Sequence, residues 1–288
     1  MALRYSTISF LSDYGIEDEF VGVVRSIVRS IAPEVVMIDI SHSIPPHDVR
    51  AGGLALARSA QYLCPGVVLA VVDPGVGTTR RAIAVEVGDG ASVLVGPDNG
   101  LLAPAVAMVG GATAAVELTN TDYHLPAPGP TFAGRDIFAP VAAHLCLGVP
   151  LRELGREIDP GELMPGILPV SRVEGDAIIA EVLWTDRFGN LQLNVAPEEI
   201  APFGNRVLVR VESGERVADV VATYADIRPG GIGLVVDSYG LLSIAADRGS
   251  AADELRAGAG SEVTLMPWIG EDRDSRSAPV RISPRGSR

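Results

Sequence analysis

The stretch VVLAVVDPG, residues 67–75, decides the fold class. Its first six residues are all apolar, and an Asp-Pro-Gly turn follows them directly. A strand of this kind is buried on both faces, as the strands of a parallel sheet are. The same sequence of apolar run and turn recurs at TISFLSD (7–13), VVMIDIS (35–41), AIAVEVG (82–88) and SVLVGPDNG (92–100).

Longer amphipathic segments alternate with these strands. In residues 18–31, Phe20, Val24, Ile27, Val28 and Ile31 recur at helical spacing. Further helices are expected over residues 49–63 and 136–147. Alternating strands and helices predict an α/β fold with an N-terminal, mostly parallel sheet that carries helices on both faces.

A second domain is expected after the Pro/Gly-rich stretch 160–173. Beyond it the sequence shows strands without long helices, which predicts a C-terminal antiparallel β-barrel. Its expected strands are 177–186, 191–195, 206–212, 231–238, 240–246 and 262–268. The predicted limits are 1–165 for the α/β domain, 173–270 for the barrel and 271–288 for a polar, disordered tail.

Composition excludes several classes of function. The 288 residues include 36 acidic and 23 basic side chains, so the net charge is −13 and neither nucleic acid nor an anionic membrane surface is an expected partner. All basic residues are arginines, which excludes Schiff-base chemistry on lysine. The N-terminal apolar stretch is too short for a signal peptide, and no run of about 18 apolar residues occurs, so we expect a cytoplasmic protein.

Cysteines and histidines give no sign of a metal site. Cys64 and Cys146 lie in apolar helical surroundings and are expected to be buried free thiols. Only His42 and His47 form even a weak pair by spacing, and His144 is interpreted as structural. No metal and no cofactor are therefore expected.

Polar loops follow four of the strands, at 12–15, 41–48, 73–77 and 96–100. Ligands of open parallel sheets bind beyond the carboxyl ends of strands, so these loops are expected to form one site. Asp13 could bind a vicinal diol such as that of a ribose, or could be a turn or helix-cap residue. Asp18 could bind a ligand amine, although the helix dipole alone explains an acid there.

Charged pairs mark two further segments. Asp73 and Arg80 could form an ion pair in which the ionised carboxylate anchors a polarised water, or a pair that only closes a turn. In TFAGRDIFAP (131–140), Arg135 beside Asp136 suggests a buried pair, and Gly134 leaves room for something to approach the backbone.

The barrel domain offers two candidate loops, DRFGN (186–190) and DSYG (237–240). Phe188 could stack on a purine while Asn190 hydrogen-bonds its edge, or the loop could be a hairpin turn with one core Phe. Ser238 could hold a carboxylate or an amine, or could simply belong to a turn.

Seven segments, in order, carry a family resemblance: SDYGIEDEFVG, DISHSIPPHDVRAG, VVDPGVGTTRR, VGPDNGLL, PTFAGRDIFAP, TDRFGNLQLN and DSYGLLSIA. With them, residues 5–268 resemble the S-adenosyl-L-methionine (SAM) hydroxide adenosyltransferases, relatives of the fluorinase and chlorinase enzymes. The resemblance implies a homotrimer with active sites between subunits, and hydrolysis of SAM to adenosine and L-methionine.

The resemblance also implies residue roles. Asp13 would hold the ribose diol, Phe188 and Asn190 the adenine, and Asp18, Asp186 and Ser238 the methionine end. Asp73 and Arg80 match two members of the Asp–Arg–His set that positions the attacking water. Phe132 and Gly134 flank the third position and are expected to contact the substrate.

That third position departs from the family, because Ala133 stands where the family has histidine in a TFHGRD-like string. Histidine is the natural acceptor for a proton of water near neutral pH, so its loss bears on catalysis more than on binding. The chain is then an engineered variant, a natural member in which Asp73 and Arg80 suffice, or a binder without catalysis. His47, in a loop that the halogenases use near the ribose, is a candidate substitute.

Two alternatives to hydrolysis remain. One is a non-catalytic protein that binds adenosine or SAM, prompted by Ala133. The other is a halogenase, whose members have Tyr and Thr where this chain has Asp73 and Val76. A carboxylate repels a halide ion, so Asp73 favours water.

Overall fold

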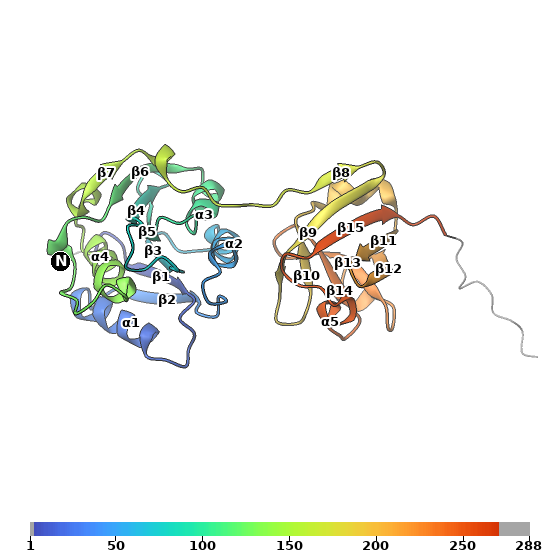
Figure 1. Ribbon diagram of the computed structural model, residues 1–288, viewed down its shortest axis with the longest axis horizontal. Coiled ribbons are helices and arrows are strands. Elements are labelled where there is room, and N and C mark those ends of the chain that lie inside the picture. Colours follow the sequence, from blue (N-terminus) through green and yellow to red (C-terminus); the bar gives the residue numbers. More distant parts are fainter. Residues whose placement is uncertain (1–2, 271–288) are drawn as a thin grey trace, which may run out of the picture. The chain divides into compact units, whose positions relative to one another are not determined.

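The computed structural model describes residues 3–270 of the chain, so the tail predicted over 271–288 lies outside the described residues. The chain divides into two compact units, Met1–Pro169 and a second that begins at Val170, and the division falls inside the Pro/Gly-rich stretch (Figure 1). Each unit has its own hydrophobic core.

Within the described residues, the first unit contains a seven-stranded sheet of spatial order β2-β1-β3-β5-β4-β6-β7. The strands are β1 (Thr7–Ser12), β2 (Val36–Ser41), β3 (Val67–Val71), β4 (Ala82–Val87), β5 (Ser92–Pro97), β6 (Ala112–Glu117) and β7 (Arg156–Ile158). Strands β2, β1, β3 and β5 pair in parallel, as predicted, whereas β4, β6 and β7 join them antiparallel. Strand β4 is apolar on both faces, so its sequence does not reveal its direction.

Helices cover both faces of this sheet, which confirms the predicted layering (Figure 1). Helices α1 (Phe20–Ile31) and α4 (Ala139–Cys146) lie on one face, and α2 (Val49–Ala60) and α3 (Ala103–Met108) on the other. Successive strand residues point to opposite faces. Phe10 of β1 accordingly shares a core with Val24 of α1, whereas its neighbour Leu11 shares one with Leu56 of α2.

Several sequence predictions in this unit need correction. The helix expected over 136–147 begins as a π-helical turn (Gly134–Phe138) that continues into α4, and α3, β6 and β7 were not predicted. Helix α2 ends at Ala60, so Cys64 is exposed in the following loop rather than buried. Cys146 is buried as expected, and this burial raises the pKa of its thiol to about 12.

Within the described residues, the second unit is a barrel closed by seven strands, with an eighth, β8, paired to β9. The elements are β8 (Arg172–Glu174), β9 (Ala177–Thr185), β10 (Leu191–Leu193), β11 (Arg206–Val211), β12 (Gly214–Val220), β13 (Ile232–Val236), β14 (Leu242–Ala246), α5 (Ala251–Leu255) and β15 (Glu262–Pro267). Pairing of β9 with β10 completes the ring. The predicted barrel is confirmed, but β12 and β13 pair in parallel because a crossover, not a hairpin, connects them.

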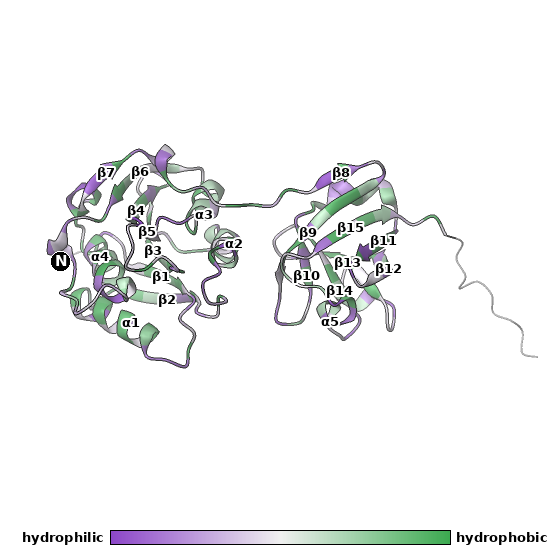
Figure 2. Cartoon of the chain, viewed as in Figure 1, coloured by the Kyte–Doolittle hydropathy of each residue, from purple (hydrophilic) through white to green (hydrophobic). Residues whose placement is uncertain are grey.

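Short 3-10 helices occupy several connections: Thr121–Tyr123, Leu151–Leu154, Pro160–Glu162, Pro197–Phe203 and Tyr224–Asp226. Hydrophobic residues concentrate in the strands of both units (Figure 2). None of the helices in residues 3–270 has the length and apolar character needed to cross a bilayer.

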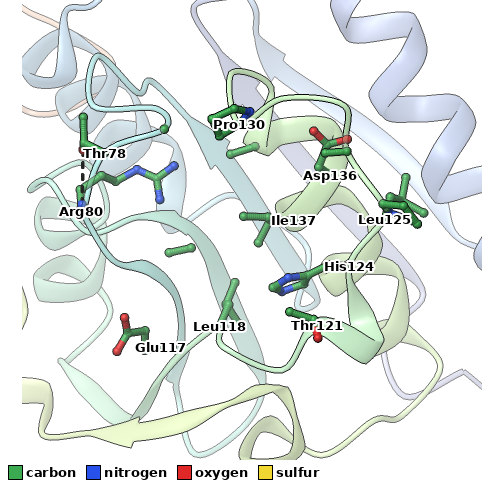
Figure 3. A pocket seen from close by; sticks show the side chains of 15 residues that line it. Thr78, Arg80, Glu117, Leu118, Thr121, His124, Leu125, Pro130, Asp136 and Ile137 are labelled. Atoms are coloured by element: carbon green, nitrogen blue, oxygen red, sulfur yellow. Dashed lines mark hydrogen bonds between the residues drawn. The ribbon is translucent and has the colours of Figure 1, made fainter.

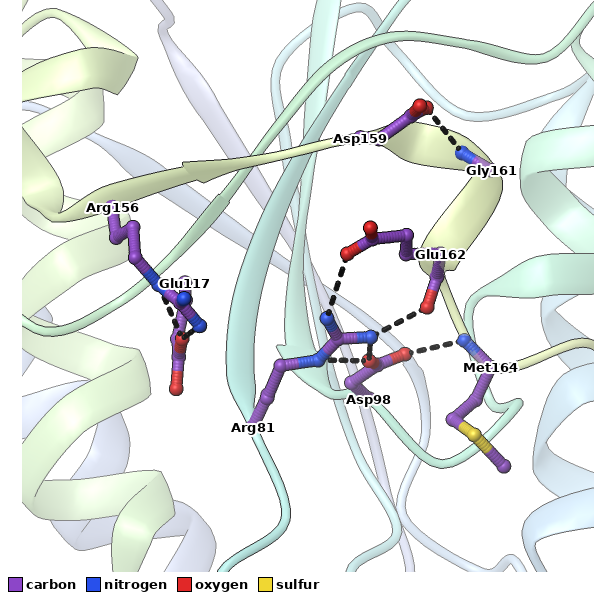
Figure 4. A network of polar contacts seen from close by, with 8 residues as sticks. All are labelled: Arg81, Asp98, Glu117, Arg156, Asp159, Gly161, Glu162 and Met164. Carbon is purple, nitrogen blue, oxygen red and sulfur yellow. Dashed lines mark hydrogen bonds and ion pairs between the residues drawn. The ribbon is translucent and has the colours of Figure 1, made fainter.

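The loop after β5 anchors the chain shortly before the unit boundary (Figure 4). Arg81 forms an ion pair with Asp98, and Asp98 Oδ1 accepts a hydrogen bond from the Met164 N–H at 2.8 Å. Arg81 also donates to the carbonyl oxygen of Glu162 at 2.6 Å. The loop 96–100, expected at the ligand site, therefore serves to hold residues 162–164 against the sheet.

Candidate functional site

A pocket of about 260 Å³ lies where the loops after β1 and β3 meet the start of the π-helical turn. We call it the front pocket. Its lining is Asp13, Tyr14, Phe20, Pro46, His47, Val71, Asp73, Val76, Thr131, Phe132, Ala133 and Gly134. Six of the predicted site residues of this unit meet here. The pocket occupies the carboxyl ends of parallel strands, where ligands of such sheets bind.

Asp13 holds a neighbouring loop in place. Its Oδ2 accepts a hydrogen bond from the backbone N–H of His47 at 2.9 Å, and His47 has a left-handed φ of 68°. Glu19 occupies the N-cap position of α1 and Asp48 that of α2, so Asp13 caps neither of the helices on either side of β2. The contact brings the loops after β1 and β2 together at the pocket. Asp18 is exposed ahead of α1 and does not line the pocket.

Asp73 and Arg80 form a two-point ion pair beneath the pocket. Arg80 Nε donates to Asp73 Oδ1 at 2.8 Å, and Arg80 Nη2 donates to Oδ2. The two side chains are only 6% and 14% exposed, and the guanidinium lies 5.3 Å from the ring centre of Phe138. The pair closes its turn, and the buried carboxylate of Asp73 also lines the pocket.

Three aromatic rings form one side of the pocket, and two of them were not predicted. Tyr14 and Phe20 lie with Phe132 at ring-centre distances of 5.1 to 5.7 Å. Burial raises the pKa of Tyr14, and the nearby carboxylates of Asp13 and Asp73 raise it further. The Tyr14 side chain is therefore an uncharged phenol at neutral pH.

Gly134 is required because Tyr14 approaches it. A Cβ atom at position 134 would overlap the Tyr14 hydroxyl oxygen and would lie 3.1 Å from Tyr14 Cζ and 3.3 Å from Phe132 Cε2. The group that the sequence analysis expected to approach the Gly134 backbone is therefore the Tyr14 side chain. Arg135 and Asp136 form the expected pair, with Arg135 Nε donating to Asp136 Oδ1 at 2.6 Å, but only the carboxylate is buried, since the Arg135 side chain is 31% exposed.

Ala133 is 6% exposed and belongs to the walls of two pockets. The second, which we call the rear pocket, has a volume of about 660 Å³ (Figure 3). Its polar lining residues are Thr78, Arg80, Glu117, Thr121, His124 and Asp136. Because it is assembled from segments between residues 77 and 137, no local sequence signal could have revealed it.

In the barrel unit, Asp186 organises the loop that carries the predicted base-binding residues. Its Oδ1 accepts from the N–H groups of Phe188 and Asn190 at 2.8 and 2.9 Å, and its Oδ2 accepts from Asn190 Nδ2 at 2.7 Å. Phe188 is 77% exposed, so it is not the core Phe of a hairpin turn. Its free ring face is available for stacking on a flat ligand.

The DSYG loop has the same construction. Asp237 Oδ1 accepts from the N–H groups of Tyr239 and Leu241 at 2.8 and 3.2 Å. Gly240 has a φ of 82°, as Gly189 has a φ of 81°. Ser238 occupies the turn position that corresponds to Arg187. Both loops are thus Asp-x-aromatic-Gly-x turns that present an aromatic side chain.

Fold and site together define a class of protein: an α/β unit with a buried carboxylate–guanidinium pair at a strand-end pocket, and a β-barrel unit whose loops present exposed aromatic side chains. Profiles of the SAM hydroxide adenosyltransferase N-terminal and C-terminal domains match residues 8–155 and 180–264. The chain belongs to this family.

Individual relatives agree with this assignment. The chain is 46% identical over 248 residues to an (R)-S-adenosyl-L-methionine hydrolase of Salinispora tropica, covering 86% of this chain and 93% of the relative. It is 40% identical to the protein of the same name from Thermus thermophilus, covering 89% and 98%. A solved structure of an uncharacterized conserved protein from Thermotoga maritima superposes with a TM-score of 0.83 at 34% identity, covering 90% and 99%.

Proposed function

We propose that this chain hydrolyses SAM to adenosine and L-methionine, with water attacking the ribose 5′-carbon. The observation that carries the proposal is the buried Asp73–Arg80 pair, whose carboxylate lines the front pocket. Membership of the SAM hydroxide adenosyltransferase family and the names of the relatives support the substrate.

The reaction needs a placed water more than it needs an acid. The leaving sulfur already carries a positive charge, so methionine departs as a neutral thioether. Asp73 binds the water and stabilises the positive charge that develops on it, while Arg80 fixes the carboxylate. Orientation of this kind contributes several kcal/mol. The rings of Tyr14, Phe20 and Phe132 stabilise the sulfonium by cation–π attraction.

Binding roles follow the family resemblance. Asp13 holds the ribose diol, and His47, whose backbone Asp13 fixes, lies beside the sugar. Phe188 stacks on the adenine and Asn190 binds its edge. Asp18, Asp186 and Ser238 hold the methionine end, and Asp186 also fixes Asn190.

We further propose a homotrimer in the cytoplasm, with substrate sites between subunits. The assembly is what the family resemblance implies. The location is supported by Cys64 and Cys146, which are both free thiols, as proteins of reducing compartments carry.

A test of the hydrolase starts from purified protein, SAM and water enriched in heavy oxygen. We expect adenosine and methionine, with the label in the adenosine 5′-hydroxyl. Asp73→Asn should lower turnover by about 100-fold or more. Asp98→Asn is a matched control, because Asp98 also binds an arginine but lies outside the front pocket, and it should leave turnover unchanged.

A second candidate function, a non-catalytic binder of adenosine or SAM, is favoured by Ala133 alone. Calorimetry that detects binding by a protein without turnover would support it, and activity of the Ala133→His variant alone would show that alanine impairs catalysis. Absence of adenosine from both proteins would overturn the enzyme assignment. Consumption of SAM only with halide present would indicate a halogenase instead.

A further inference from the structure

The rear pocket contains an imidazole nitrogen without a partner. His124 Nε2 is buried and, within residues 3–270, makes no hydrogen bond. Buried polar atoms are nearly always hydrogen-bonded to protein or to ordered water. The imidazole of His124 and the guanidinium of Arg80 extend into this pocket from opposite sides (Figure 3). A volume of about 660 Å³ accommodates several water molecules, since each occupies about 30 Å³ in the liquid.

The two pockets adjoin at the reaction site. Ala133 lines both of them, Asp73 lines the front pocket, and Arg80 lines the rear pocket. The ion pair between Asp73 and Arg80 therefore reaches from one pocket to the other. A methyl group at position 133 leaves more of this shared wall open than a larger side chain would.

Hydrolysis of SAM releases a proton that needs an acceptor. The water oxygen forms a bond to the 5′-carbon, the carbon–sulfur bond breaks with its electron pair on sulfur, and the attacking water loses one proton. Both oxygens of Asp73 accept hydrogen bonds from Arg80. Asp73 must again present an unprotonated carboxylate to the next water before a second turnover, so the proton has to leave this site.

We propose that water in the rear pocket carries this proton past Ala133 and Arg80 to His124 Nε2. The inference rests on the proposed hydrolase function and assigns a proton-relay residue to it. His124 acts through water and does not touch SAM.

The charges around His124 suit this role. Burial lowers the pKa of His124, so its ring is neutral and able to accept a proton at neutral pH. The other charged groups that line the rear pocket are Arg80, Glu117 and Asp136, each of which is paired: with Asp73, Arg156 and Arg135 respectively. Asp122 lies on the short helix Thr121–Tyr123 that ends just before His124, and it is exposed to solvent.

The test compares His124→Gln with His144→Gln over a range of pH. His144 is a matched control, because burial also lowers its pKa while its ring packs on Tyr123 and does not line the rear pocket. In the unmodified protein, kcat should rise with pH through the pKa of His124, below about 6.5, and then level off. His124→Gln should lower kcat by about 10-fold or more, abolish this rise and leave KM for SAM within about twofold. His144→Gln should behave as the unmodified protein.

Imidazole provides a second measurement that a structural role would not reproduce. It should restore part of the turnover of a folded His124→Ala variant and none in a His144→Ala variant. The inference is wrong if His124→Gln keeps the kcat and pH profile of the unmodified protein. It is equally wrong if the kinetic rise does not coincide with the His124 titration followed by NMR in the unmodified protein, a comparison that needs no variant. Lack of adenosine from the unmodified protein would instead overturn the proposed function.

Discussion

Replacing Gly134 with alanine tests the contact on which the front pocket is built. The new Cβ would overlap the Tyr14 hydroxyl and crowd Tyr14 Cζ and Phe132 Cε2 at 3.1 and 3.3 Å. Overpacking of this kind costs about 1–3 kcal/mol. For a unit of this size, that corresponds to a decrease of roughly 2–4 °C in Tm per kcal/mol.

The main overlap is with one oxygen atom, so a double-mutant cycle isolates it. Tyr14→Phe removes that oxygen, and Gly134→Ala should then cost less by about 1 kcal/mol or more. Gly22→Ala is the matched control, because a Cβ there meets nothing within 4 Å and α1 should gain about 0.5–1 kcal/mol from alanine. Far-UV circular dichroism follows the first unit, which contains α1 to α4.

The two tryptophans, Trp184 and Trp268, both lie in the second unit, so their fluorescence serves as an internal reference that should not change. Equal costs of Gly134→Ala in the unmodified protein and in the Tyr14→Phe variant would refute the reasoning, because the hydroxyl would then not be the group that glycine accommodates. A change in the unfolding midpoint seen by fluorescence and not by circular dichroism would also refute it, because the substitution would then destabilise the second unit instead of the first.

Three further predictions concern titration and packing. In the native protein a thiol reagent should modify Cys64 quickly and Cys146 only on unfolding, because Cys146 is buried with a pKa of about 12; equal rates would contradict this. Burial lowers the pKa of His42, so the unfolded chain binds more protons than the folded protein does. The free energy of unfolding should therefore fall as the pH drops below about 6.5. Denaturant unfolding of the His42→Gln variant should show a weaker dependence on pH. Asp186→Ala removes the acceptor of three hydrogen bonds and should destabilise the second unit by about 1–3 kcal/mol while raising KM for SAM, as fluorescence-detected unfolding and initial rates would report.

The layered architecture could be predicted because it depends on periodicity along the chain. Successive side chains of β1 and β3 point into two different cores, one on each face of the sheet. The uninterrupted apolar runs of these strands in the sequence indicate this burial on both faces. The direction of each strand was harder to predict than its position in the sequence. Apart from Glu86, strand β4 is as apolar and buried as β3, so its sequence does not reveal that it runs antiparallel to β5.

Contacts of the candidate site between residues close together in the sequence could be predicted. Contacts between residues far apart in the sequence could not. The ion pair of Asp73 with Arg80 lies within one turn, and spacing revealed it. The approach of Tyr14 to Gly134 joins positions 120 residues apart in the chain, which no pattern in either segment could signal. The same applies to His124, whose neighbours at the rear pocket come from other loops.

The two Asp-x-aromatic-Gly-x turns of the barrel are each held by their own aspartate and glycine, and not by the residue that follows the aspartate. Arg187 and Ser238 can therefore be exchanged without rebuilding the backbone beneath them. A library of variants aimed at altered ligand preference should therefore vary positions 187 and 238, because substitutions there leave the hydrogen bonds that hold each turn in place.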